Sequence, residues 1–171
     1  LKTKPTFDPL KDLEPISPIA VTAFAIAVHP SVSANNLKEL VAYVKANPGK
    51  MSYGSAGHGS LNHLTGELFK LRTGLTDFPH VPYRGAGPGL TDLLAGQIPA
   101  LVPAMTNIVA EHHRAGRLKV LAVTHGKRLA AAPELPTAVE QGFPDLVAPH
   151  FIGLFTPAAV PKVIVAAISA A

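Results

Sequence analysis

Short apolar runs and amphipathic stretches alternate along this chain. Continuous apolar runs are typical of buried strands, whereas apolar residues spaced three or four apart are typical of helices that pack with one face. Because the two patterns alternate, the sequence predicts an α/β fold with helices flanking mostly parallel strands. The expected strands are residues 19–28, 51–55, 78–82, 98–102, 118–124 and 151–155, and the expected helices are residues 37–44, 61–73, 89–95, 108–115, 137–141 and 161–170.

The expected helix at residues 61–73 has recognisable start and stop signals. Ser60 is suited to cap its N-terminus, and Gly74 is suited to end it, because glycine adopts the left-handed conformation common just past a helix. Leucines recur at helical spacing between these two residues, so we expect them to form the buried face. These leucines are Leu61, Leu64, Leu68 and Leu71.

Prolines dominate the first 18 residues. Proline lacks a backbone N–H and cannot continue a helix, so four of them in this short stretch predict an irregular segment. They are Pro5, Pro9, Pro15 and Pro18.

The composition excludes several classes of protein. Hydrophobic residues make up 47% of the 171 positions and charged residues 15%, which favours a substantial core over disorder. The net charge of +4 comes from scattered basic residues, so no nucleic-acid partner is expected. The chain has no cysteine, which excludes disulfides and thiol chemistry. No apolar run reaches the roughly 18 residues that a membrane span needs, so no membrane insertion is expected.

The glycine-rich stretch at residues 53–60 (Tyr-Gly-Ser-Ala-Gly-His-Gly-Ser) is the most informative motif. It lies between an expected strand and an expected helix. A strand that turns through glycines into a helix N-terminus presents free backbone N–H groups, and the helix dipole adds positive potential there. The stretch therefore predicts an anion-binding turn, although a tight turn that merely needs glycine would have the same sequence.

More specific phosphate and catalytic motifs do not fit this turn. A dinucleotide fingerprint would place a third glycine where Asn62 stands, and Asp77 is a poor match for its acidic residue. No Gly-Lys-Ser/Thr triplet follows, which excludes a P-loop. Ser60 lacks the flanking glycines of a nucleophile elbow. A generic anion site remains.

The eight histidines do not show metal-binding spacing. His112 and His113 are consecutive and so point to different sides of a helix, while His58 and His63 lie five residues apart, a poor fit to one ion on a helix. We therefore expect no metal and no cofactor. His63, at the third position after Ser60, is expected to order the glycine-rich turn.

A second polar cluster, Tyr83-Arg84-Gly85, follows the expected strand at residues 78–82. Ligands of open α/β sheets bind beyond the carboxyl ends of the strands, so this cluster is expected at the same edge as the glycine-rich turn. Arg84 is suited to pair with a carboxylate, although a surface arginine is the other interpretation. Asp92 is expected to be solvated or to cap a helix. The acidic residues form no cluster with a candidate base, which favours binding over catalysis.

Ordered motifs over nearly the whole chain resemble the substrate-binding proteins of tripartite tricarboxylate transporters, also called the Bug family of periplasmic receptors. They include Asp-Pro-Leu-Lys-Asp-Leu at residues 8–13, His-Pro-Ser-Val at 29–32, Ala-Asn-Pro-Gly-Lys at 46–50, the glycine-rich turn at 53–60, Val-Pro-Tyr-Arg-Gly at 81–85, Ala-Gly-Arg-Leu at 115–118, Leu-Ala-Val-Thr at 121–124, Glu-Gln-Gly at 140–142 and Phe-Ile-Gly-Leu-Phe at 151–155.

The resemblance implies a type II periplasmic-binding-protein fold of the Venus-flytrap kind, in which two lobes close around a small carboxylate and deliver it to a membrane permease. It implies a periplasmic location, with no signal peptide in this sequence. It also implies that the N-terminal strand-loop-helix and the C-terminal part of lobe one are missing. Residues 1–28 would be the end of lobe one and a crossing, 29–124 lobe two, and 125–171 the return crossing and the start of the C-terminal part of lobe one.

The same resemblance assigns a ligand-binding half-site to lobe two. In relatives a strand ends in Phe-Asp where this chain has Leu-Val-Pro-Ala at residues 101–104, which implies a change in ligand choice or in cleft geometry. The residues carried over are Ser55, Ala56, Gly57, His58, Gly59 and Ser60, with Tyr83, Arg84 and Gly85 as the adjoining wall.

Two other hypotheses stay open at this point. One is an α/β enzyme that acts on a carboxylated substrate with His58 or His63 as its base. The other is an interaction domain that binds no small ligand.

Overall fold

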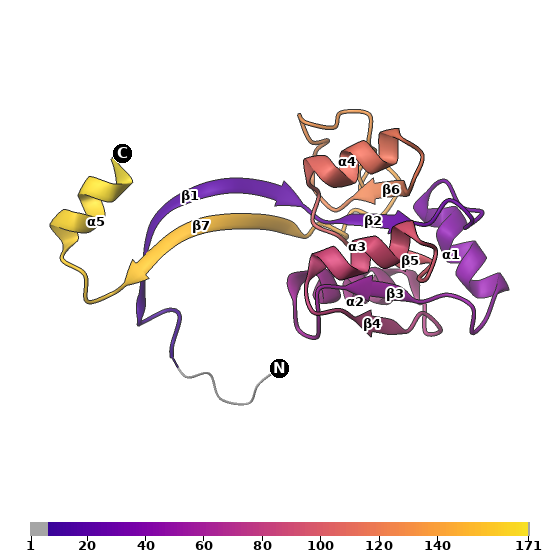
Figure 1. Ribbon diagram of the computed structural model, residues 1–171, viewed down its shortest axis with the longest axis horizontal. Helices are drawn as coiled ribbons and strands as arrows, with labels where there is room; N and C mark the ends of the chain where they lie inside the picture. Colours follow the sequence, from indigo (N-terminus) through magenta and orange to yellow (C-terminus); the bar gives the residue numbers. More distant parts are fainter. Residues whose placement is uncertain (1–6, 171) are drawn as a thin grey trace. The chain divides into compact units, whose positions relative to one another are not determined.

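The computed structural model describes residues 7–170 and divides the chain into two compact units (Figure 1). We call Thr22–His150 the lobe unit, and the segments up to Val21 and from Phe151 onward the ribbon unit. The lobe boundaries expected from the resemblance stay a prediction.

Seven strands and five helices are found in the described residues. The strands are β1 (Leu13–Ala23), β2 (Ala25–Val28), β3 (Tyr53–Ser55), β4 (His80–Pro82), β5 (Ala100–Leu101), β6 (Lys119–Val123) and β7 (Pro149–Pro157). The helices are α1 (Leu37–Ala46), α2 (Leu61–Thr73), α3 (Ala86–Leu94), α4 (Asn107–Arg114) and α5 (Lys162–Ser169).

The lobe unit is built on a five-stranded sheet of order β4-β3-β5-β2-β6. β3 runs parallel to both β4 and β5, whereas β2 runs antiparallel to β5 and β6. Four strands therefore share one direction and only β2 opposes them. The predicted α/β fold is confirmed, and the sheet is mixed, with two parallel and two antiparallel pairings.

Both faces of this sheet are covered, as β2 illustrates. Ile26 and Val28 pack in one hydrophobic cluster with residues of α1 and α2, whereas Ala25 and Ala27 pack in a second cluster with residues of α3 and α4. Successive strand residues point to opposite faces, so a strand covered on both sides must be apolar throughout. This explains why the sequence there is a continuous apolar run.

The ribbon unit pairs β1 with β7 in a two-stranded sheet, whose strands run in opposite directions in Figure 1. The expectation of an irregular N-terminal segment was wrong from Leu13 onward, since β1 includes Pro15 and Pro18. Both strands of a two-stranded sheet are edge strands, and proline is tolerated in edge strands. Residues 1–6, with Pro5, lie outside the described residues.

Two further expectations were wrong in detail. The single strand expected at residues 19–28 is divided between β1 and β2, with Phe24 between them. The helix expected at residues 137–141 is replaced by turns, because the chain there pairs with β6: Val123 donates to the Pro136 carbonyl, and Ala138 donates to the Val123 carbonyl.

The ends of α2 follow the sequence prediction, but its buried face does not. The Ser60 side chain accepts a hydrogen bond from the His63 N–H, and Gly74 ends the helix with φ +66°. The buried positions are instead Thr65, Gly66 and Phe69. A methyl group at Gly66 would overlap the Tyr53 ring, so this side of the helix packs closely against β3. Of the four leucines, Leu61, Leu64 and Leu71 are exposed and Leu68 is half-buried.

Candidate functional site

The two polar segments singled out from the sequence meet at one edge of the sheet. The glycine-rich turn follows β3 and the Tyr83–Gly85 segment follows β4, and these strands are parallel neighbours. The Tyr83 N–H donates to the Ser55 carbonyl at 3.0 Å, and the Gly85 N–H donates to the Ala56 carbonyl at 3.3 Å. The loops therefore lie side by side at the carboxyl ends of their strands.

The glycine-rich turn presents several free N–H groups. Two of its amides are used internally: Gly57 donates to the Ser55 hydroxyl at 3.1 Å, and Gly59 donates to His63 Nδ1 at 3.1 Å. Both glycines have positive φ, which favours glycine at these positions. Helix α2 carries no acidic residue in its first turn. Among the described residues, no partner accepts from the N–H groups of Ala56, His58, Leu61 and Asn62.

Ser60 acts mainly as the cap of α2. Its hydroxyl donates to the Gly57 carbonyl at 2.7 Å and accepts from the His63 N–H at 3.2 Å. The Ser60 hydroxyl could donate a hydrogen bond to a ligand only if its bond to the Gly57 carbonyl were broken. The prediction that His63 orders this turn is confirmed by its bond from Gly59.

The loop after β4, Tyr83–Gly85, contains one cationic side chain. Arg84 is exposed and forms no ion pair with any described residue. Tyr83 instead packs between Gly54 and Gly89, where an added methyl group would meet its ring, and its hydroxyl donates to Asp92 at 2.7 Å. Burial and the Asp92 carboxylate raise the pKa of Tyr83 to about 12. Asp92 therefore anchors Tyr83, which the sequence did not predict.

His80, which sequence reasoning missed, stands beside the turn on β4. Its Nε2 lies 2.6 Å from the Ser55 hydroxyl, and its ring stacks on His63 with centroids 4.0 Å apart. The His58 ring lies edge-on at 5.1 Å from that of His80. Burial and the neighbouring histidines lower the pKa of His80 to about 4, so its ring is neutral at pH 7. No sequence spacing indicates this cluster, because it depends on the pairing of β3 with β4.

A hydrogen-bonded network supports the turn from α2. The Tyr53 hydroxyl donates to Glu67 at 2.6 Å, and Lys70 pairs with the same carboxylate at 3.0 Å. Burial opposes ionisation of Glu67, but the bonds from Tyr53 and Lys70 outweigh it and lower the pKa of Glu67. The network connects β3 to α2, the two elements that flank the turn.

β5 runs parallel to β3, so its carboxyl end lies at the same edge of the sheet as the glycine-rich turn, but the segment that follows β5 supplies no charged side chain. Val102 and Pro103 follow β5 and are buried, and the Val102 carbonyl accepts from the Asn62 side chain at 2.8 Å. The segment thus offers backbone atoms and apolar side chains, with no carboxylate of its own. Asn62, which stands where a dinucleotide fingerprint needs glycine, joins this segment to the start of α2.

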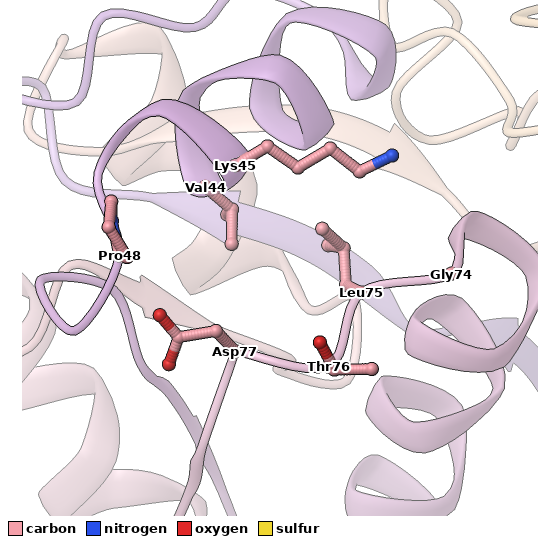
Figure 2. Close-up of a pocket in the computed structure, with 7 residues that line it drawn as sticks. All are labelled: Val44, Lys45, Pro48, Gly74, Leu75, Thr76 and Asp77. Atoms are coloured by element: carbon pink, nitrogen blue, oxygen red, sulfur yellow. The ribbon is translucent and has the colours of Figure 1, made fainter.

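A separate pocket of about 220 Å³ lies between the end of α1 and the loop after α2, and Figure 2 shows the residues that line it. Asp77 lines it, and this carboxylate accepts from the Gly49 N–H at 2.6 Å. Asp77 precedes β4, whereas the glycine-rich turn follows β3, so the two lie at opposite ends of parallel strands. Asp77 therefore cannot serve a ligand held at the turn, which removes the dinucleotide interpretation.

Comparison with known proteins agrees with this architecture. The model of the tripartite tricarboxylate transporter family receptor, TctC, matches residues 1–171. The chain belongs to this family. This chain is 36% identical over 157 residues to protein BugT of Bordetella pertussis, in an alignment that covers 91% of this chain and 48% of BugT. The resemblance inferred from the sequence motifs is confirmed.

Solved structures give the same result for the fold. The chain matches R. palustris Rpa4515 with adipate at a TM-score of 0.87 and 31% identity, covering 95% of this chain and 54% of that one. It matches MatC from Rhodopseudomonas palustris with bound malate at a TM-score of 0.86 and 28% identity, covering 97% and 56%. The expected periplasmic-binding-protein fold is confirmed. The chain spans about half the length of these relatives.

The matching family is one of receptors, and two structural neighbours are a periplasmic transporter and the periplasmic binding protein BugD. No helix among residues 7–170 has the length and apolar character that crossing a bilayer requires.

Proposed function

We propose that this chain supplies one half of a periplasmic receptor site for a small carboxylate. The observation that carries the proposal is the set of free N–H groups where the glycine-rich turn enters α2. A carboxylate bound there would accept from amides that have no partner among the described residues, at the positive end of a helix dipole. The ligand class is a di- or tricarboxylate, an amino acid or an aromatic acid.

Arg84 would add a charge-assisted hydrogen bond from the adjoining loop. It is exposed and unpaired in the described residues, and its loop is hydrogen-bonded to the turn. Backbone amides with one exposed arginine suit a carrier, since the ligand must be released after capture. A deeply buried ion pair would resist release.

Capture would proceed by closure of two lobes around the ligand, followed by delivery to a membrane permease of the tripartite tricarboxylate type. The family supports this role, as do relatives solved with adipate and malate. Action in the periplasm and partnership with the permease are part of the proposal.

Calorimetry of the whole protein with adipate, malate, citrate, an amino acid and an aromatic acid tests the ligand class. Arg84→Gln is expected to weaken binding about tenfold or more, because a bond to a charged group contributes roughly 1.5–3 kcal/mol. Arg117→Gln, which changes an exposed arginine after α4, is the matched control and should leave binding unchanged. A protein that binds no di- or tricarboxylate, amino acid or aromatic acid would overturn the proposal.

A second pair of variants tests the turn itself. Gly57→Ala would force a side chain into φ +128° and place its Cβ 3.1 Å from the Tyr83 carbonyl, so binding should be lost. Gly116→Ala places a side chain at φ +68°, in the left-handed region, with nothing within 4 Å of its Cβ, and it should bind normally. Equal loss in both variants would mean that the turn has no special part in binding.

The competing hypothesis of a histidine-based enzyme makes a different prediction. Replacing His58 and His63 should abolish turnover of a carboxylated substrate in an enzyme, but should leave a receptor with reduced or unchanged affinity. Product analysis of the wild-type protein incubated with its ligand separates the two, since a receptor returns the ligand unaltered.

A further inference from the structure

Three histidines from three separate segments converge beside the glycine-rich turn. His58 lies in the turn itself, His63 on the first turn of α2, and His80 on β4. One ring nitrogen of each lies within 4.8 Å of a ring nitrogen of the other two. Over residues 7–170 this is the only group of three or more potential metal-ligating side chains at such distances.

The hydrogen bonds of Ser55 determine which nitrogen of His80 carries the proton. The Ser55 hydroxyl has one proton, and its neighbours are the Gly57 carbonyl at 3.2 Å, the Gly57 N–H at 3.1 Å and His80 Nε2 at 2.6 Å. If Nε2–H donates to Ser55, the hydroxyl can donate to the Gly57 carbonyl and all three bonds form. If Nδ1 carried the proton, one of these bonds would be lost.

The favoured tautomer leaves a free lone pair on His80 Nδ1. This atom is buried and has no hydrogen-bond partner among the described residues. Buried polar atoms normally have a partner, so an unsatisfied one needs an explanation. Metal-bound histidines commonly donate their second N–H to an oxygen, as His80 would donate to Ser55.

We propose that His58, His63 and His80 bind a divalent transition-metal ion of the zinc class through three imidazole nitrogens. Imidazole suits Zn²⁺, Cu²⁺ and Ni²⁺, and three histidines leave one coordination position open. Because His58 is exposed, the site is accessible from solvent. The proposal goes beyond carboxylate binding and does not depend on it.

Binding would change the glycine-rich turn through His63. Its Nδ1 accepts from the Gly59 N–H, so the proton of the neutral ring is on Nε2. An ion at Nδ1 would replace the Gly59 bond directly, and an ion at Nε2 would move the ring proton to Nδ1. In both cases the Gly59 N–H loses its partner and joins the free amides of the turn.

Zn²⁺ calorimetry and Co²⁺ absorption spectroscopy on the whole untagged chain test the proposal. One Zn²⁺ per chain should bind, Co²⁺ should give visible bands, and the Gly59 amide resonance should shift. His58→Ala removes an exposed ligand, and His63→Gln keeps an acceptor for Gly59. Each should weaken Zn²⁺ binding at least about tenfold. Ser55→Ala, which keeps all three histidines, should weaken it by about 10–100-fold.

His125→Ala is the matched control, since the His125 ring is hydrogen-bonded to the backbone of Lys127. It should bind Zn²⁺ like the wild type, and thermal unfolding should show that every variant is folded. Absence of Zn²⁺ binding in the wild type, or binding unchanged by His58→Ala and His63→Gln, would overturn the proposal. A carboxylate titration without metal separates this outcome from failure of the proposed function.

Discussion

The lobe unit and the ribbon unit differ in how much apolar surface they bury. The sheet of the lobe unit has two hydrophobic clusters, which contain most of the fully buried side chains of the chain. In the ribbon unit Ile19 is 66% exposed, Phe151 62% and Val163 75%, and Val165 is the only buried apolar residue in its described part. The ribbon unit is instead held by strand pairing and by polar bonds such as Lys162–Glu14 at 2.7 Å.

The difference shows what burial on two faces contributes to stability. Burying an apolar side chain contributes roughly 1.5–3 kcal/mol relative to leaving it exposed, whereas exposed ion pairs contribute about 0–1 kcal/mol. A two-stranded sheet alone is marginally stable in water. We therefore expect the stability of this chain to reside in the lobe unit.

The largest expected effect comes from separating the units. A fragment of residues 22–150 should fold and unfold cooperatively, because both of its hydrophobic clusters lie within it. Peptides covering residues 7–21 and 151–170 should remain unfolded when mixed. Circular dichroism and amide NMR dispersion measure both. An unfolded 22–150 fragment would refute this assignment of stability.

Core truncation should affect the two units very differently. Leu121 is buried in β6, so Leu121→Ala should lower the free energy of unfolding by about 2–5 kcal/mol. Val163 on α5 is exposed, so Val163→Ala should change it by no more than about 0.5 kcal/mol. Urea unfolding measures both values. Equal losses would show that Val163 packs against other protein in solution.

Glycine substitution offers a finer comparison. Gly66→Ala would place a methyl group in the Tyr53 ring and should cost about 1–3 kcal/mol, as overpacking of a core does. The corresponding methyl at Gly153 would meet the Phe155 ring at 3.0 Å. Phe155 is exposed and can move, so Gly153→Ala should alter the unfolding free energy by less than about 1 kcal/mol. Thermal melts of the two variants compare them directly.

The smallest effect concerns surface charge. The Thr137 N–H and then Arg128 lower the pKa of Glu140 below its ordinary value. A carboxyl with a lowered folded-state pKa stabilises the fold above its unfolded pKa, and this is lost as pH falls through the folded pKa. Glu140→Gln should therefore lower the Tm at pH 7, with the difference shrinking below about pH 4. Lys162→Met in the ribbon unit should change the Tm less than Glu140→Gln does. A larger change would contradict the expectation that the stability of the chain resides in the lobe unit.

Several features that depend on local sequence were predicted correctly. Ser60 and Gly74 bound α2 as expected, because capping involves residues only a few positions apart. The alternation of apolar runs and amphipathic stretches was sufficient for the α/β fold. Motifs spread along the chain identified the family, because each motif is a short local pattern and many of them occur in the same order.

The candidate site was only partly predictable. Residues 55–60 and Arg84 were named from the sequence, because a strand-to-helix turn and a strand end are local patterns. His80 was missed, since it joins His58 and His63 only through the pairing of Tyr53 with His80 across β3 and β4. The role of Asp92 as partner of Tyr83 likewise depends on packing of α3 against β3.

The sequence by itself determined most helices and strands of the lobe unit, the caps of α2 and the glycine-rich turn, because backbone preferences act over a few residues. Tertiary structure alone decided which face of α2 is buried. The spacing of its leucines predicted one face, whereas the face that contains Gly66 packs closely against Tyr53 and is buried. It also decided that Pro15 and Pro18 lie in a strand, since both strands of a two-stranded sheet are edge strands, where proline is tolerated. These outcomes depend on which surfaces meet, and residues far apart in the sequence supply those surfaces.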